Sequence, residues 1–100
     1  MRDYILLMHN DSLNAAIAND AALWDRYFNI LQQSGCFEGG SEIGDGQSFR
    51  KNSEPAAACR QLTGYLRIRA DSLAQAHSFL HGNPIYEANG TVEIRELPRD

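Results

Sequence analysis

The fold is decided by two stretches of this sequence, Tyr4-Ile5-Leu6-Leu7-Met8 and Leu62-Thr63-Gly64-Tyr65-Leu66-Arg67-Ile68. Each reads as a strand that enters a turn. Each is followed by the same tripeptide, which is Asp11-Ser12-Leu13 after the first stretch and Asp71-Ser72-Leu73 after the second. The repetition indicates a fold of two halves, each consisting of a strand followed by a helix.

The two stretches differ in how their apolar residues are spaced. Residues Tyr4 to His9 are apolar at nearly every position, which is typical of a central strand that is covered on both faces. In the second stretch, apolar residues alternate with Thr63, Tyr65, Arg67 and Arg69. This period of two predicts a strand whose faces differ in chemistry.

A helix is predicted after each strand. From about Asp20 to Ser34, apolar residues recur at intervals of three and four and form one broad stripe, and Gly35 can end the helix. The second helix begins at Asp71 or Ser72, either of which can cap it, and it ends near Gly82.

The remaining segments complete the predicted order of elements. Residues 36–46 are rich in glycine, so the backbone there is expected to bend or bulge. A short strand is predicted from Gln47 to Lys51, and the last strand from Thr91 to Leu97. The order β-α-β-β-α-β, in a single domain of residues 1–100, matches the ferredoxin-like α+β fold. That fold has a four-stranded antiparallel sheet with both helices on one face.

The other face of such a sheet is left open. Because the first strand is apolar on both sides and the chain has no third predicted helix, a second copy of the chain is the simplest cover. Face-to-face packing places Tyr65, Arg67 and Arg69, with Glu93 and Arg95, at or near the interface, where opposite charges can pair. The sequence therefore predicts a homodimer formed through the open sheet face.

Composition argues against several other partners. The net charge is −4 and the arginines are evenly scattered, so no basic stripe is available for nucleic acid. No stretch approaches the ~18 consecutive apolar residues of a membrane span, and the N-terminus lacks a signal-peptide pattern, so we expect a cytoplasmic protein. Neither Cys36 and Cys59 nor His77 and His81 have a further ligand at metal-binding spacing, so we expect no metal and no cofactor.

Four motifs extend over nearly the whole chain: a short N-terminal strand, a helix with Trp-x-x-Tyr that ends before Gly, a Gly-Gly pair after an apolar residue, and a long C-terminal block. In this sequence they are Tyr4–Met8; Trp24, Tyr27 and Gly35; Phe37-Glu38-Gly39-Gly40; and Gln61-Leu62-Thr63-Gly64-Tyr65 leading to Asp71-Ser72-Leu73, Gly82-Asn83-Pro84 and Gly90-Thr91-Val92-Glu93-Ile94-Arg95. In these motifs the chain resembles the YCII-related proteins, which are small bacterial domains. The resemblance implies the dimeric α+β barrel form of the ferredoxin-like fold.

The chain departs from the pattern of this family at two places. Many relatives carry Asp-Gly-Pro-Phe before the third strand, where this chain has Asn52-Ser53-Glu54-Pro55, so it belongs outside that subgroup or has lost its loop. Other relatives carry a histidine on the first helix, proposed to work with an aspartate as an acid–base pair. This helix has no histidine, and Trp24 lies near the expected place. The resemblance therefore implies the fold more strongly than a reaction.

Two hypotheses for function follow. In the first, the homodimer binds a small organic molecule in a cleft between the sheet and the first helix, without catalysis. Trp24 and Phe28 could line an aromatic pocket there, although a stripe at helical spacing is more often core. The ligand-binding residues predicted for this cleft are His9, Trp24, Phe28, Glu42 and Tyr65.

The second hypothesis is a cofactor-free lyase or isomerase. His9 would be the general base, because histidine titrates near neutral pH and this one ends a strand, where sites often lie. Asp45 or Glu42, in the glycine-rich stretch, would assist it. The simpler interpretations are a histidine that only ends a strand and carboxylates that are solvated in a turn. A third, structural hypothesis is an assembly element whose pocket is filled by its own side chains.

Overall fold

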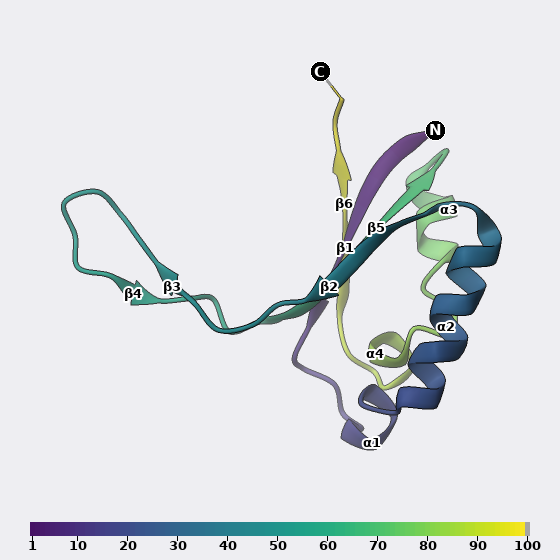
Figure 1. Cartoon of the computed structure of the whole chain (residues 1–100), viewed down its shortest axis with the longest axis horizontal. Coiled ribbons are helices and arrows are strands. Elements are labelled where there is room, and N and C mark those ends of the chain that lie inside the picture. The colour runs from purple at the N-terminus through teal and green to yellow at the C-terminus, as the bar shows by residue number, and fades with distance from the viewer. Residues whose placement is uncertain (100) are drawn as a thin grey trace.

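The computed structural model describes residues 1–99 and shows one layer of helices packed on one sheet (Figure 1). The main sheet has four antiparallel strands in the order β2-β5-β1-β6, namely β1 (Arg2–His9), β2 (Phe37–Glu42), β5 (Leu62–Ala70) and β6 (Val92–Leu97). The helices lie together on one side of it and are α1 (Ala15–Ala18), α2 (Ala21–Ser34), α3 (Leu73–Ser78) and α4 (Pro84–Glu87). The predicted ferredoxin-like α+β fold is confirmed.

Strand β1 is central, as its apolar sequence predicts, and it pairs antiparallel with β5 on one side and β6 on the other. Tyr4, Leu6 and Met8 face the helices and are 2%, 0% and 5% exposed. Ile5 and Leu7 point to the opposite face and are only half-buried. The chain's own helices therefore cover one side of the central strand and leave the other side open.

Helix α2 has the bounds that its sequence predicts. The Asp20 carboxylate caps it by accepting from the amides of Ala22 and Leu23, at 2.9 and 3.2 Å. Gly35 ends the helix with a φ of 73°, a left-handed conformation that glycine adopts without strain. Buried Tyr27 donates its hydroxyl to the carbonyl of Phe79 at 2.8 Å. Burial raises the pKa of Tyr27 to about 12, which keeps this hydroxyl protonated.

The second strand of the main sheet is not where the sequence predicts it. It is β2, in the glycine-rich stretch, whereas residues 47–51 contribute only the two-residue strand β3 (Gln47–Ser48) to a separate small sheet with β4 (Ala56–Ala57). The glycines explain this position. The pairing of β2 with β5 shifts register between Phe37 and Gly40, and Gly39 has a φ of 102°. A Cβ atom on Gly40 would collide with the carbonyl of Tyr65, so only glycine allows this approach.

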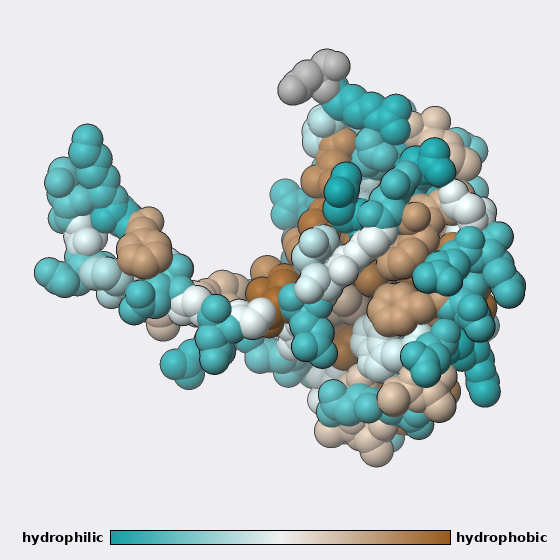
Figure 2. Space-filling model, viewed as in Figure 1, coloured by the Kyte–Doolittle hydropathy of each residue, from teal (hydrophilic) through white to brown (hydrophobic). Residues whose placement is uncertain are grey.

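Residues 44–60, here named the arm, extend away from the body of the molecule (Figure 1). The arm contains the small sheet of β3 and β4, and all of its residues except Ala58 are exposed. Most of its surface is hydrophilic, whereas hydrophobic residues gather on the body (Figure 2). One exception is Phe49, an aromatic residue of the arm that is 75% exposed.

The C-terminal half contains one helix more than predicted. Helix α3 is capped by Ser72, as expected, but it ends at Ser78 and not near Gly82. Asn83 then caps α4, where the sequence predicts only a turn and a loop. Its side-chain oxygen accepts from the amides of Ile85 and Tyr86 at 3.0 and 3.1 Å, and the residue is fully buried. Pro84 fits the first turn because its missing N–H would have no partner there.

The described residues do not meet the requirements of a membrane-spanning helix or of a three-ligand metal site. No helix within residues 1–99 has the length and apolar character needed to cross a membrane. In the same part of the chain, no three side chains of histidine, cysteine, aspartate or glutamate are arranged to hold a metal ion. Both cysteines are free thiols, with Cys36 buried and Cys59 exposed.

Candidate functional site

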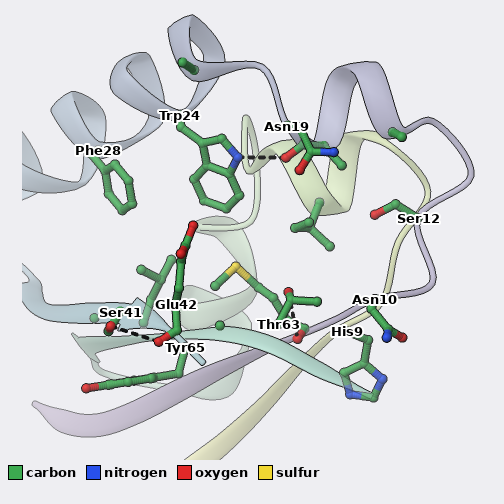
Figure 3. Close-up of a pocket in the computed structure, with 18 of the residues that line it drawn as sticks. His9, Asn10, Ser12, Asn19, Trp24, Phe28, Ser41, Glu42, Thr63 and Tyr65 are labelled. Atoms are coloured by element: carbon green, nitrogen blue, oxygen red, sulfur yellow. Dashed lines mark hydrogen bonds between the residues drawn. The ribbon is translucent and has the colours of Figure 1, made fainter. Parts of the chain in front are cut away.

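A cavity of about 650 Å³ lies between helix α2 and the sheet (Figure 3). Its helical side is formed by residues spaced three and four apart on one face of α2, which are Ala21, Trp24, Asp25 and Phe28. Its floor is formed by the helix-facing side of β1, β2 and β5, and the segment before α1 closes one end. The volume is within the range of about 300–1,000 Å³ that is usual for small-molecule sites.

The wall on α2 is aromatic. Trp24 and Phe28 are stacked, with ring centroids 5.6 Å apart and ring planes at 29°, and both rings hang from the helix toward the sheet (Figure 3). Phe37 of β2, which is outside the cavity lining, packs against Phe28 with the ring centroids 5.9 Å apart. The indole nitrogen of Trp24 donates to the carbonyl of Ala18 at 2.8 Å, which holds the ring in place. The cavity is therefore bordered by a preorganised aromatic surface.

Carboxylates face this wall. Glu42, near the end of β2, rises from the sheet toward the rings of Trp24 and Phe28 (Figure 3). Gly40 is two residues earlier on the same strand and allows β2 to approach β5 closely enough to form the floor. Asp25 supplies a second carboxylate from the helix side. The site thus combines an apolar ring surface with negatively charged groups.

His9 borders the cavity, but its ring is turned to the other face of the sheet (Figure 3). Its Nε2 lies 3.2 Å from Oε1 of Glu93, which is on the open face opposite Leu7. Glu93 also accepts from Arg95 at 3.0 Å. Two hydrogen bonds lower the pKa of Glu93 below its ordinary value, and the one from Arg95 has a larger effect than the one from His9. His9 therefore has an ionised carboxylate as its partner.

The other predicted site residues separate into two locations. Tyr65 borders the cavity through its place in β5, but its side chain points to the open face, opposite Leu7. Asp45 lies at the base of the arm, in a second cavity of about 360 Å³ that it shares with Cys59 and Arg60. The structure therefore brings Trp24, Phe28 and Glu42 together in the main cavity. It does not bring Asp45 into the cavity that His9 borders.

Asp25 and Asn19, which were not predicted as site residues, also line the main cavity. Helical periodicity could have found Asp25, because it lies four residues after Ala21 and three before Phe28, on the face that carries Trp24. Asn19 precedes the helix, and no periodic signal marks it. Its place depends on how the chain turns between α1 and α2.

Comparisons with known proteins bear on the fold. No protein-family model matches the chain, and no curated protein matches it. Among solved structures, the chain is similar to 5-chloro-2-hydroxyhydroquinone dehydrochlorinase (TftG) from Burkholderia phenoliruptrix AC1100, in complex with 2,5-dihydroxybenzoquinone. The TM-score is 0.60 at 20% sequence identity, and the match covers 100% of this chain and 96% of the other. The likeness shows the fold alone, an α+β fold with a four-stranded antiparallel sheet.

Proposed function

We propose that this protein is a YCII-related homodimer that binds a small organic molecule with a planar ring in the cavity between α2 and the sheet. The observation that carries the proposal is the stacked pair of Trp24 and Phe28, held in place over a cavity of about 650 Å³. Offset stacking on such rings favours flat ligands. In support, the dehydrochlorinase of the same fold was solved with a small ring compound bound.

The homodimer part of this proposal concerns the open face of the sheet. Ile5 and Leu7 form a half-buried apolar centre there, beside Tyr65, and charged residues surround them. An apolar centre with a polar rim is the usual anatomy of a protein interface. The arm gives further support, because a two-stranded hairpin with an exposed Phe49 is only marginally stable without packing against something else.

Ligand binding can be measured through Trp24, the only tryptophan of the chain. We expect uncharged rings such as phenol, hydroquinone and catechol to change its fluorescence and to raise the melting temperature. Phe28→Ala should weaken binding by about tenfold or more, because it removes one face of the stack. Ile30→Ala is the matched control, since Ile30 is on the same helix, 47% exposed and outside the cavity lining. The proposal is wrong if no ring compound binds at millimolar concentration, or if Phe28→Ala binds as the wild type does.

A cofactor-free lyase or isomerase is the second candidate, with its reaction on the open face of the sheet, where the His9 ring lies, and one contact favours it. The ring of His9 is held by the ionised carboxylate of Glu93 at 3.2 Å, and a carboxylate of this kind orients the imidazole of a general base. Turnover assays on any bound ligand should then lose activity in His9→Ala and in Glu93→Gln. A ligand that both the wild type and His9→Ala bind and leave unchanged would argue against this enzyme.

A further inference from the structure

We propose that the cavity selects an organic cation, in which an aromatic body lies on Trp24 and Phe28 and an ammonium group is bound by Glu42 with Asp25. This inference rests on the proposed function, because it concerns the same cavity, and it adds the charge of the ligand. The class that fits is an arylalkylamine, which is a flat ring joined by a short chain to a protonated amine.

The charges that line the cavity are unbalanced. Glu42 and Asp25 are both carboxylates, and within residues 1–99 no lysine or arginine lines the cavity. The ion pairs found in that part of the chain use other carboxylates, those of Asp3, Glu38, Glu93 and Glu96. His9 does not compensate, because its Nε2 is paired with Glu93 on the other face of the sheet. The negative charge of Glu42 and Asp25 is therefore available to a ligand.

The hydrogen-bond donors of the lining point to the same ligand class, because several of them are already used within the chain. The indole nitrogen of Trp24 donates to Ala18, the Asn10 amide to Arg60, the Thr63 hydroxyl to Met8 and the Ser41 hydroxyl to Glu42, in each case to a backbone carbonyl. One lining group stays open to a ligand, because the Ser12 hydroxyl is buried without a hydrogen-bond partner within residues 1–99. A hydroxyl can accept as well as donate, so with the Glu42 and Asp25 carboxylates it offers acceptors to an ammonium group, which only donates.

The N-terminus of α2 is closed to anions as well. A helix N-terminus is ordinarily a site for negative groups, because its first amides have no partner within the helix. Here the Asp20 carboxylate accepts from the amides of Ala22 and Leu23. These two amides are therefore not available to a negatively charged ligand.

The aromatic wall adds an attraction of its own for a cation. The faces of aromatic rings carry partial negative charge, and tryptophan is the strongest ring of this kind. Trp24 and Phe28 are within one stack, and Glu42 rises toward both rings (Figure 3). The Glu42 carboxylate and a ring face can therefore act on the same ammonium group.

Three ligands with the same phenyl ring and polar groups of different charge test this inference: phenethylamine as the cation, 2-phenylethanol as the neutral compound and phenylacetate as the anion. Titrations followed by Trp24 fluorescence and by calorimetry should give an affinity for the amine about tenfold above that for the alcohol, because hydrogen bonds to charged groups are the stronger ones. Phenylacetate should not bind. Raising the salt concentration should weaken the binding of phenethylamine and leave the binding of 2-phenylethanol unchanged, because salt screens only the interaction between charged groups.

Single-residue variants test whether Glu42 and Asp25 cause the preference for phenethylamine. Glu42→Gln should lower the affinity for phenethylamine by about tenfold and leave that for 2-phenylethanol unchanged, and Asp25→Asn should act in the same direction. Glu54→Gln on the arm, which is exposed and outside the cavity lining, is the matched control and should change neither. Both site variants alter exposed residues, and circular dichroism checks that they fold.

The outcomes separate the two proposals. The inference about charge is wrong if phenylacetate binds as tightly as phenethylamine. It is also wrong if the double variant Glu42→Gln, Asp25→Asn still prefers phenethylamine to 2-phenylethanol. If the alcohol and the amine bind equally well, the proposed ring-binding function stands and the charge selection fails. If none of the three compounds binds, and the uncharged phenols do not bind either, both proposals are overturned.

Discussion

The two faces of the main sheet are built from alternate residues of the same strands, yet they differ in burial and in the chemistry of their side chains. On β1, Leu6 faces the helices and is fully buried, while its neighbour Leu7 faces outward and is half-buried. Across from Leu6 lie Leu66 and Ile94, and across from Leu7 lie Tyr65 and Glu93. The covered face carries the buried core and the cavity beside it, and the open face mixes apolar and charged groups. A sheet face that mixes apolar and charged groups in this way fits a surface that packs against another molecule.

The largest expected effect is a loss of stability, and it tests the difference between the two faces at two adjacent leucines. Leu6→Ala should lower the free energy of unfolding by about 3 kcal/mol, because it leaves a cavity in the packed core. Leu7→Ala, at low chain concentration, should cost about 1 kcal/mol or less, since part of its side chain already meets water. Urea denaturation gives both values. Equal losses at the two positions would contradict the distinction between the faces.

A smaller loss is expected from the polar residue buried beside the covered face. Asn83→Ala should cost about 2 kcal/mol, because it leaves the amides of Ile85 and Tyr86 without their partner inside the protein. Asn14→Ala is the matched control, since Asn14 is itself exposed where it caps α1 and should cost at most about 1 kcal/mol. The same denaturation experiment compares them, and a larger loss at Asn14 would argue against this account.

The open face is tested by oligomeric state. Sedimentation of the wild type at tens of micromolar should give the mass of two chains, whereas Leu7→Asp should weaken association by about tenfold or more, because it places a charge in the apolar centre of the interface. Ile30→Asp, on the outer side of α2, should leave the mass unchanged. Single chains of wild type under these conditions would show that the open face is a solvated surface and not an interface.

The smallest effect is a dependence of stability on pH that comes from carboxylates outside the core. Hydrogen bonds from Arg99 to Asp3 and from Thr91 to Asp11 lower the pKa of each carboxyl below its ordinary value of 3.8. Folding thus favours the ionised forms, so their contribution is present above about pH 4 and is lost as the pH falls through the lowered pKa values.

The pH effect can be measured by urea denaturation between pH 5 and pH 2. The urea midpoint should fall as the pH is lowered, and the fall should be shallower in the Asp3→Asn, Asp11→Asn double variant. Because both residues lie near the surface, added salt should reduce the effect of the Asp3–Arg99 pair. A double variant that loses stability with pH as steeply as the wild type would show that other groups cause the acid sensitivity.

Much of the fold could be predicted because local signals agreed with the tertiary structure. The alternation in β5, the apolar run of β1 and the capped stripe of α2 each specify an element without reference to distant residues. Strand β2 could not be predicted, because its sequence Phe-Glu-Gly-Gly-Ser-Glu has low strand propensity and it is held by pairing with β5. Helix α4 was missed because four residues give no periodic pattern.

The sequence by itself determined that the chain has strands and helices in the order of a ferredoxin-like fold, and that one stripe of α2 carries Trp24 and Phe28. The alternation in β5 predicted that Tyr65 faces the open side, and only the tertiary structure decided which side of the sheet His9 and Glu42 face. Glu42 points into the cavity, and the side chains of His9 and Tyr65 point away from it. The reason is that a shift of one residue in strand register reverses every side chain, and register at β1 and β2 depends on bulges that form only when distant strands pair.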